Sequence, residues 1–443
     1  MQSGILISTT QQENLVSSKV CAGDKKLYHA LELDGQSYQT MEGFGGCFNE
    51  LGYIALNKIS TEKKEEVLRN LFGVEECNFT YCRLPIGAND YSANWYSLNE
   101  IQGDYEMRNF SIERDKEYLI PYIKEAEKYG GKLNLFASPW SPPTWMKSSP
   151  VYNFGTLIWE ERNLKAYALY FKRFIEEYEK EGIKINQVHI QNEPIADQKF
   201  PSCVWSGKEL RDFVKNYIGP LFEKSKMDTE IWLGTLNSPY DDYGDSNWQF
   251  GQYNNFANTV LSDKEAKKYI SGVGYQWGGK HALLQTKVAY PEMKLIQTES
   301  ECGDGKNSFE YAEYVFNLIW TYLINGACAY TYWNMVLEEG GGSTWGWSQN
   351  SLITVKDNKE IKYNPEYYLM RHFSKYIKQG AIMKGLKGDY AGNALAFENP
   401  DGSIILEILN PFDDIQEVTF HIKGINYNFN MKAHSFNTLI IDA

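Results

Sequence analysis

Eight short apolar segments recur between residues 41 and 336, and each ends at a polar, glycine or proline cluster. They are rich in β-branched and aromatic residues, which is typical of strands buried on both faces. The predicted strands are 41–48, 78–87, 132–141, 185–192, 229–236, 270–277, 293–299 and 328–336. Eight is the number of strands in a β/α barrel.

Segments with helical character lie between these strands, at 61–72, 113–129, 163–182, 207–226, 262–269 and 308–325. Pro121 falls inside the second segment and marks a helix start or a kink there, because proline removes an interior hydrogen bond. Strands that alternate with helices predict the α/β class with a parallel, closed sheet. We therefore predict a (β/α)8 TIM barrel.

The pattern changes after about residue 375. Alternating segments at 394–397, 403–409, 417–422 and 438–441 are separated by Asn-Pro, Asp-Gly and Lys-Gly turns, which predicts a small antiparallel β domain. Strand-like pieces at 5–9 and 28–33 add to it from the other end of the chain. We predict a barrel over residues 39–376 and a side β-sandwich domain built from residues 1–38 and 377–443.

The charge and composition narrow the kind of partner. A net charge of −13 and a pI near 5.1 argue against a nucleic-acid or anionic-membrane surface and favour a neutral or polar small molecule. Aromatic residues make up 15% of the chain, and exposed rings are natural platforms for the apolar faces of sugars. The oligomeric state is not predicted.

The chain has no apolar stretch of about 18 residues, so no integral membrane segment is expected. Its first residues lack a basic region followed by a long apolar one, which predicts a cytoplasmic protein, or a secreted one if the start has been processed. Seven scattered cysteines without C-x-x-C and six histidines without H-x-H or H-E-x-x-H spacing signal neither a disulfide framework nor a metal site. No cofactor is expected.

Two glutamates carry the candidate chemistry. Glu193 ends the fourth predicted strand and Glu299 the seventh, and in a closed barrel both ends face the same mouth. Two carboxyl groups can flank a glycosidic bond there, and a separation of roughly 5 Å would specify a retaining double displacement. Asn192 precedes Glu193 and can hold a sugar 2-hydroxyl, so Glu193 is predicted as the general acid and base. Glu299 is then the nucleophile, kept ionised by Arg83.

Several motifs carry a resemblance to a known family. They are Gly43-Phe-Gly-Gly46, Arg83-Leu-Pro-Ile-Gly87 with Asn89-Asp90, Ala137-Ser-Pro-Trp-Ser-Pro-Pro-Thr-Trp145, Gln191-Asn-Glu-Pro194, Thr298-Glu299 and Tyr332-Trp-Asn334. Together they resemble glycoside hydrolase family 30, the family of glucosylceramidase, from about residue 40 to 380. The resemblance implies a (β/α)8 barrel with a side β-sandwich, a retaining mechanism and β-linked sugar substrates.

The resemblance also assigns residues. It implies the acid/base role for Glu193, the nucleophile role for Glu299, and sugar binding by Asp90, Trp140, Asn192 and Trp333. Where glucosylceramidase has a His-Trp pair after strand six, this chain has Tyr275-Gln276-Trp277, so Gln276 and Trp277 are predicted to contact substrate. Arg83 is predicted to orient Glu299 rather than to react.

Each assignment has a structural alternative. Asp90 is otherwise a turn former, and Trp140 and Trp333 are otherwise barrel core. Glu301 would compete with Glu299 if the strand register were misjudged, and Glu50 either hydrogen-bonds in the site or caps a helix. Phe200 and Trp205 either stack on an aglycone or pack their loop. Residues 338–347 form a glycine-rich loop long enough to close over a ligand.

The sequence therefore predicts a retaining β-glycosidase that hydrolyses β-glucosidic bonds through a covalent glycosyl-enzyme. An endo-β-1,6-glucanase and a β-xylosidase are alternatives on the same barrel. A non-catalytic carbohydrate-binding barrel is the alternative from a different class.

Overall fold

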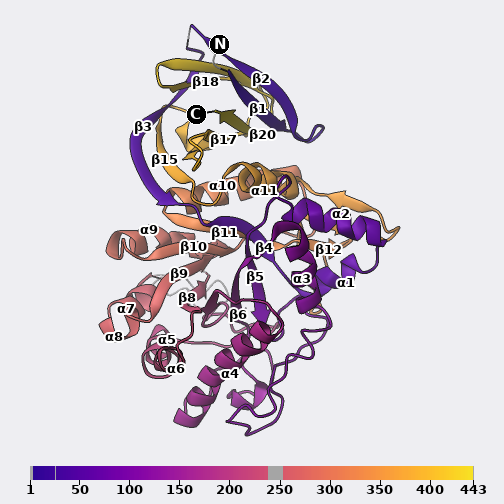
Figure 1. Cartoon of the computed structure of the whole chain (residues 1–443), viewed down its shortest axis with the longest axis vertical. Coiled ribbons are helices and arrows are strands. Elements are labelled where there is room, and N and C mark those ends of the chain that lie inside the picture. The colour runs from indigo at the N-terminus through magenta and orange to yellow at the C-terminus, as the bar shows by residue number, and fades with distance from the viewer. Residues whose placement is uncertain (1–2, 25, 238–252, 443) are drawn as a thin grey trace.

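The computed structural model describes residues 3–24, 26–237 and 253–442. Eight parallel strands close into a barrel in the ring order β10-β11-β4-β5-β6-β7-β8-β9, which confirms the predicted fold. Figure 1 shows the barrel with its helices below a separate β domain that holds both chain ends. The barrel strands are β4 (Gly43–Cys47), β5 (Tyr81–Ile86), β6 (Asn134–Pro139), β7 (Gln187–His189), β8 (Glu230–Leu236), β9 (Ile270–Gln276), β10 (Lys294–Glu299) and β11 (Ala327–Asn334).

Helices follow the strands around the barrel. The larger ones are α1 (Glu50–Leu56), α2 (Thr61–Phe72), α3 (Leu119–Gly130), α4 (Glu161–Lys180), α5 (Gly207–Phe213), α6 (Gly219–Ser225), α9 (Lys280–Ala289), α10 (Phe309–Ile324) and α11 (Pro365–Tyr376). A π-helical segment at Val214–Ile218 joins α5 to α6, and the short α7 (Thr259–Leu261) and α8 (Lys264–Lys267) precede β9. Pro121 lies in the first turn of α3, where a missing N–H costs nothing, so it marks the helix start rather than a kink.

Local sequence explains why these helices form where they do. The Ser60 side chain accepts a hydrogen bond from the Lys63 amide and so caps α2, which buries Val67, Leu68 and Leu71 on one face. The longer α4 buries a stripe against the barrel at three- and four-residue spacing: Leu164, Tyr167, Ala168, Phe171, Phe174, Ile175 and Tyr178. Burial of these stripes, rather than helix propensity, stabilises the outer ring.

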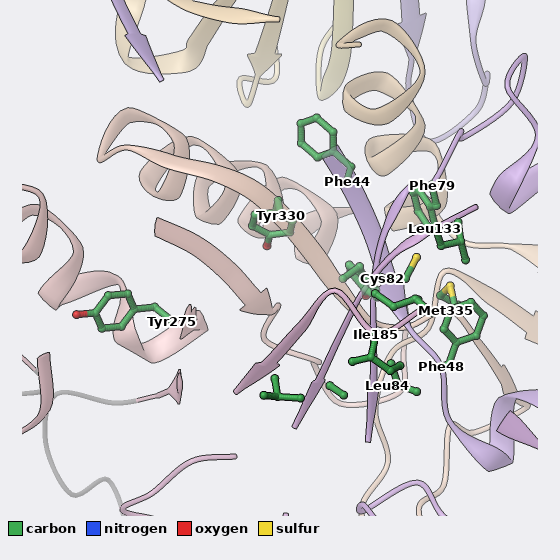
Figure 2. Packing of buried hydrophobic residues seen from close by; sticks show 14 of the residues in the cluster. Phe44, Phe48, Phe79, Cys82, Leu84, Leu133, Ile185, Tyr275, Tyr330 and Met335 are labelled. Atoms are coloured by element: carbon green, nitrogen blue, oxygen red, sulfur yellow. The ribbon is translucent and has the colours of Figure 1, made fainter. Parts of the chain in front are cut away.

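The space between strands and helices is densely filled. Figure 2 shows Phe44, Phe48, Cys82 and Leu84 among the buried side chains of this layer. Gly45 permits the close approach of β4 and β5, because a Cβ there would lie 2.0 Å from the Tyr81 carbonyl oxygen. Any larger residue at position 45 would force these two strands apart.

The barrel interior is layered from apolar to polar. Residues two apart on a strand share a face, so Tyr81 and Arg83 both point inward, as do Phe136 and Ser138. Tyr81 and Phe136 form a small apolar cluster with Trp232 and Ile296 below the mouth. The polar Arg83 and Ser138 follow in the next layer, nearer the carboxyl ends of the strands.

In the described part of the chain, the β domain has nine strands, which come from both ends of the sequence. They are β1 (Ser3–Thr9), β2 (Val16–Gly23), β3 (His29–Thr40), β15 (Ile382–Lys387), β16 (Ala394–Glu398), β17 (Ile404–Asn410), β18 (Gln416–Ile422), β19 (Ile425–Met431) and β20 (Ser435–Ile441). Their order is β1-β2-β19-β18-β3-β15-β16-β17-β20, and β1 pairs back with β20. All pairings are antiparallel, as predicted, except that β18 runs parallel to β3.

The two domains meet through α11 and the aromatic rings around it. Phe373 of α11 packs on Phe44 of β4 and on Phe316 of α10, while Phe316 and Phe309 stack on Phe436 of β20. A small sheet of β12 (Val336–Glu338), β13 (Ile353–Val355) and β14 (Ile361–Tyr363) lies after barrel strand eight and was not predicted. In the part of the chain that the structure describes, no helix has the length and apolar character needed to cross a bilayer.

Candidate active site

Glu193 and Glu299 line one pocket of about 540 Å³ at the carboxyl ends of the barrel strands. Glu299 is the last residue of β10, and Glu193 lies four residues beyond the end of β7. Glu193 adopts a left-handed backbone (φ 43°), held by a hydrogen bond from its amide to the Thr235 carbonyl. Such a conformation costs about 1–3 kcal/mol and persists where the surroundings over-determine it. Another pocket, of about 620 Å³, lies at the opposite end of the barrel beside α4 and α6.

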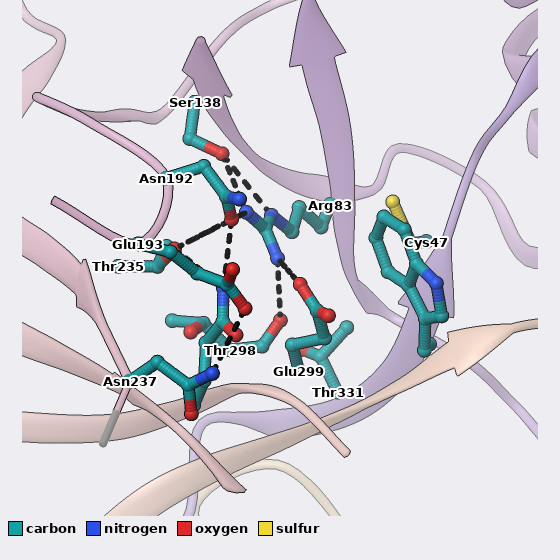
Figure 3. Close-up of polar contacts among 12 residues, drawn as sticks. Cys47, Arg83, Ser138, Asn192, Glu193, Thr235, Asn237, Thr298, Glu299 and Thr331 are labelled. Atoms are coloured by element: carbon teal, nitrogen blue, oxygen red, sulfur yellow. Dashed lines mark hydrogen bonds and ion pairs between the residues drawn. The ribbon is translucent and has the colours of Figure 1, made fainter. Parts of the chain in front are cut away.

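Arg83 organises the floor of the pocket (Figure 3). Its Nη1 donates to Glu299 Oε2 at 2.5 Å, and its Nη2 donates to Asn192 Oδ1 at 2.6 Å. Ser138 Oγ accepts from both Nε and Nη2, at 3.1 and 2.8 Å. The guanidinium is fully buried, so these partners fix its plane and, through it, the carboxylate of Glu299.

Asn192 is oriented by three donors on one atom. Its Oδ1 accepts from Arg83 Nη2, from Thr235 Oγ1 at 3.0 Å and from Gln276 Nε2 at 2.7 Å. Because three donors point at this atom, it is the amide oxygen, and the Nδ2 group points away from these donors. Asn192 lines the pocket, so Nδ2 is the donor it can offer to a bound sugar.

Glu193 has one bound and one unbound oxygen. Asn237 Nδ2 donates to Oε1 at 2.9 Å, and Asn237 Oδ1 is itself held by the Gly278 amide at 3.0 Å. Among the described residues Oε2 has no hydrogen-bond partner, although it is buried. A proton on Oε2 would therefore be available to a ligand in the pocket.

Glu299, Glu193 and Asp90 have different surroundings, which give their carboxyl groups different pKa values. Burial raises the pKa of Glu299 to about 6, and the neighbouring Arg83 charge and hydrogen bond oppose that rise. Burial, and then the charges of Glu299 and Asp90, raise the pKa of Glu193 well above its usual range. Burial and the charge of Glu299 also raise the pKa of Asp90 to about 8. Near pH 7 this pattern favours an ionised Glu299 beside a protonated Glu193.

Two tryptophans cover the arginine. Trp140 and Trp333 stack with ring centroids 5.6 Å apart, and the Arg83 guanidinium lies 4.4 Å from the Trp140 ring. Trp140 lines the pocket, whereas Trp333 is fully buried and its Nε1 donates to Gln349 Oε1 at 2.9 Å. The two rings exclude water from the surroundings of Arg83. The lower local dielectric strengthens the ion pair between Arg83 and Glu299.

More aromatic residues surround the outer part of the pocket. They come from three different loops: Phe200 after β7, Trp277 after β9, and Trp345 and Trp347 between β12 and β13. The glycine-rich loop after strand eight therefore does reach the pocket. Gln198, Glu301, Cys302, Gly303 and Gln349 supply the remaining polar and small lining groups.

Several predicted or considered residues lie outside the pocket lining. Gln276 is fully buried behind Asn192 and Thr235, so it orients Asn192 and does not face a ligand. Trp333 is likewise absent from the lining, and it contacts two residues that do line the pocket, Trp140 by stacking and Gln349 by a hydrogen bond. Trp205 is 2% exposed and packs on Tyr167 and Phe213, which makes it loop core.

The competing glutamates have other partners. Glu50 is fully buried and accepts from Arg114 Nε and Nη2 at 2.9 and 3.0 Å, in an ion pair away from the pocket. It lies in the first turn of α1, whose cap is Asn49. Glu301 lines the pocket but accepts from the Tyr314 hydroxyl, while Arg83 contacts only Glu299 of the two.

Sequence reasoning missed Asn237 and Gln349, and it predicted the loop 338–347 over the ligand without assigning a role to Trp345 or Trp347. Asn237 follows β8 directly, and an asparagine one residue beyond a barrel strand is the one signal that could have marked it. Gln349 has no such signal, because its contacts with Trp333 and Asn334 arise only when the loop folds back over strand eight.

Comparison with known proteins now identifies the family. Residues 41–377 match the model of the glycosyl hydrolase family 30 TIM-barrel domain, and residues 391–439 match that of the family 30 beta sandwich domain. The chain belongs to glycosyl hydrolase family 30. It is therefore a glycoside hydrolase, and the predicted family and fold are confirmed.

Relatives within family 30 carry two kinds of name. A putative glucosylceramidase 1 of Caenorhabditis elegans is 30% identical over 403 residues, covering 85% of this chain and 74% of that protein. The lysosomal acid glucosylceramidase of Mus musculus is 28% identical over 402 residues, covering 85% and 76%. The solved structure of the endo-β1,6-glucanase BT3312 superposes with a TM-score of 0.88 at 25% identity, covering 100% of this chain and 99% of that one.

Proposed function

We propose that this family 30 enzyme is a retaining β-glucosidase in which Glu299 is the nucleophile and Glu193 the acid and base. In the first step the Glu299 carboxylate attacks the anomeric carbon while Glu193 protonates the leaving oxygen. A glucosyl ester on Glu299 results, and the aglycone departs as an alcohol. In the second step Glu193, now a carboxylate, takes a proton from water, which attacks the anomeric carbon and frees Glu299.

The single observation that carries this proposal is the unequal pairing of the two carboxyl groups. Glu299 is bound to the buried Arg83 at 2.5 Å, which stabilises its charge. Glu193 is buried, its Oε2 has no hydrogen-bond partner among the described residues, and the charges of two other acidic groups act on it, which stabilises its proton. Two carboxyls whose environments push their pKa values apart are suited to one nucleophile and one acid.

The residues beside the pair support a single sugar in the pocket. Asn192 Nδ2 is positioned to donate to a sugar 2-hydroxyl, a hydrogen bond that strengthens as the oxocarbenium-like transition state forms. Asp90 has an unpartnered, buried Oδ1 among the described residues and accepts from hydroxyls farther along the sugar. Trp140 lines the pocket beside them and adds apolar surface to it.

The absence of a cationic side chain from the described lining supports a neutral sugar. Asp90, Glu193, Glu299 and Glu301 line the pocket, and no lysine or arginine among the described residues does so. Arg83 lies beneath the lining with Nε, Nη1 and Nη2 all bound. A sugar acid would enter without a free cationic partner, which is unfavourable in a buried site.

A substrate panel tests the proposal against its alternatives. Aryl β-glucoside, aryl β-xyloside and aryl β-glucuronide are compared by kcat/KM, and the product anomer is read by NMR during the first turnovers. We expect the glucoside to be the best substrate and β-glucose to form first. Preference for the xyloside would favour the β-xylosidase alternative, and an initial α-product would exclude a retaining mechanism.

The pH dependence should follow the two glutamates. We expect kcat/KM for the aryl β-glucoside to rise as pH increases through about 6, because Glu299 must be ionised. At higher pH kcat/KM should fall, because Glu193 loses the proton that it must donate. Burial and then the charge of Glu299 raise the pKa of Glu193 above its usual range, so this fall lies at higher pH than for an ordinary glutamate. A profile without the rising limb would contradict the assignment of Glu299.

Asn237→Ala should move only one limb of that profile. The Asn237 amide donates to the Glu193 carboxyl and lowers its pKa, so removing the donor raises that pKa further. The falling limb should therefore shift to higher pH while the rising limb stays in place. A shift of the rising limb alone would show that Asn237 acts on Glu299 instead.

A further inference from the structure

The loop between β12 and β13 folds into a compact hairpin over the pocket. Gly340, Gly341 and Gly346 adopt left-handed backbones (φ 84°, 60° and 93°), which permit its tight turns. The Ser343 amide donates to the Trp347 carbonyl at 2.7 Å, and the Gln349 amide donates to the Gly341 carbonyl at 2.9 Å. The hairpin thus presents Trp345 and Trp347 from a defined turn.

The hairpin is anchored on the loop after barrel strand two. The Tyr91 hydroxyl donates to the Gly341 carbonyl at 2.9 Å, and Thr344 Oγ1 donates to the Asp90 carbonyl at 3.5 Å. From its other end Gln349 accepts from Trp333 and Asn334 of β11. The loop after β11 therefore passes over the end of β4 and contacts the loop after β5.

Trp345 of the hairpin contacts Phe200, which lies in the loop after barrel strand four. Its ring lies 5.3 Å from that of Phe200, centroid to centroid, and stacks on Trp347 at 5.5 Å. In the eight-membered ring β7 and β11 are four places apart, so they lie on opposite sides of the barrel. The Phe200–Trp345 contact, here called the aromatic bridge, spans the mouth between them.

The bridge borders the half of the mouth formed by β4, β5 and β6. Asp90 and Trp140 follow β5 and β6, so both lie in that half. Trp345 follows Thr344, whose hydroxyl contacts the Asp90 carbonyl, so one end of the bridge lies beside Asp90. If Asp90 binds hydroxyls distant from the anomeric carbon, as the proposed function requires, then the non-reducing end of the sugar points toward Trp345. A second sugar attached to those hydroxyls would meet the rings of Phe200 and Trp345.

We propose that the aromatic bridge closes the pocket behind one sugar and makes the enzyme an exo-glucosidase that releases a single residue from the non-reducing end. This inference rests on the proposed function, because it uses Asp90 as the ligand for the distal hydroxyls. Phe200 and Trp345 thereby determine specificity by steric exclusion of a longer glycone, without contacting the reacting atoms.

The test compares first-turnover products from aryl β-gentiobioside and aryl β-cellobioside. Cleavage of the bond to the aryl group releases a disaccharide and needs space for the second sugar beyond the first. Cleavage of the bond between the two sugars releases glucose and does not need that space. We expect the unaltered enzyme to release glucose. In Trp345→Ala and in Phe200→Ala the ratio of disaccharide to glucose should rise by at least about 10-fold, as expected when a steric block is removed.

Trp159→Ala is the matched control. Trp159 is 39% exposed and packs on Trp205, outside the pocket lining, so its loss should leave the product ratio unchanged. If the unaltered enzyme releases disaccharide at once, or if both bridge variants fold and still release only glucose, the bridge is not the wall. If aryl β-glucoside itself is not cleaved, the proposed function fails instead, so the two failures are distinguishable.

Discussion

Glu299→Gln should lower kcat on an aryl β-glucoside by about 10⁴- to 10⁶-fold, the range expected when a nucleophile that acts with its partners is removed. The amide accepts a hydrogen bond from Arg83 but cannot attack the anomeric carbon. The glucosyl ester therefore does not form, and mass spectrometry with a slow fluorinated glucoside should label the unaltered protein at Glu299 and leave the variant unlabelled.

Glu301→Gln is the matched control for that loss. Glu301 lies two residues on and lines the same pocket, but Tyr314 binds it and Arg83 does not. We expect its kcat to fall by less than about 10-fold, because it has no part in the covalent step. Thermal unfolding of both variants shows whether the fold is retained. Near-normal turnover by a folded Glu299→Gln protein would show that another group is the nucleophile.

Glu193→Ala should lose about 10²- to 10⁴-fold on glucosides with poor leaving groups, the usual contribution of a general acid. An activated aryl leaving group departs without a proton, so the first step should be much less affected on that substrate. The second step still lacks its base. Added azide, which needs no deprotonation, should enter the space left by the side chain and restore turnover.

The product of azide rescue gives an independent check. Azide that attacks a glucosyl ester on Glu299 yields a β-glucosyl azide, whereas direct displacement from the substrate yields the α-anomer. NMR distinguishes the two. Equal losses on good and poor leaving groups, with no azide effect, would remove Glu193 from the acid/base role.

The different roles of Glu299 and Glu193 follow from their different contacts with Arg83. The arginine donates a hydrogen bond to Glu299, whereas near Glu193 it hydrogen-bonds only to the preceding residue, Asn192. Its charge also lowers the pKa of Glu193, but burial and then the charges of Glu299 and Asp90 raise that pKa by more. It therefore stabilises charge on Glu299 without also providing a hydrogen bond to Glu193. A hydrogen bond from the same cation to Glu193 would lower the pKa of Glu193 further and favour loss of the proton that the leaving group needs.

The eight barrel strands could be predicted because buried parallel strands are continuous apolar runs. Each predicted segment overlaps an observed strand, from Gly43–Cys47 to Ala327–Asn334. Strands of the β domain were found less completely. Val16–Gly23 is mostly exposed and carries no apolar run, so its place in the sheet depends on pairing with Ser3–Thr9 and Ile425–Met431.

The sequence by itself determined the family 30 barrel, its C-terminal β domain and the positions of Glu193 and Glu299 at two strand ends, because strand periodicity and short motifs are local properties of a chain. Only the tertiary structure decided which groups surround that pair. Asn237 meets Glu193 across 44 residues, and Phe200 meets Trp345 from the opposite side of the ring. Such contacts depend on barrel closure and loop paths. The place of Asn237 directly after a strand could mark it as a residue of the barrel mouth, but no local pattern along the chain predicts which residues it or Phe200 contacts.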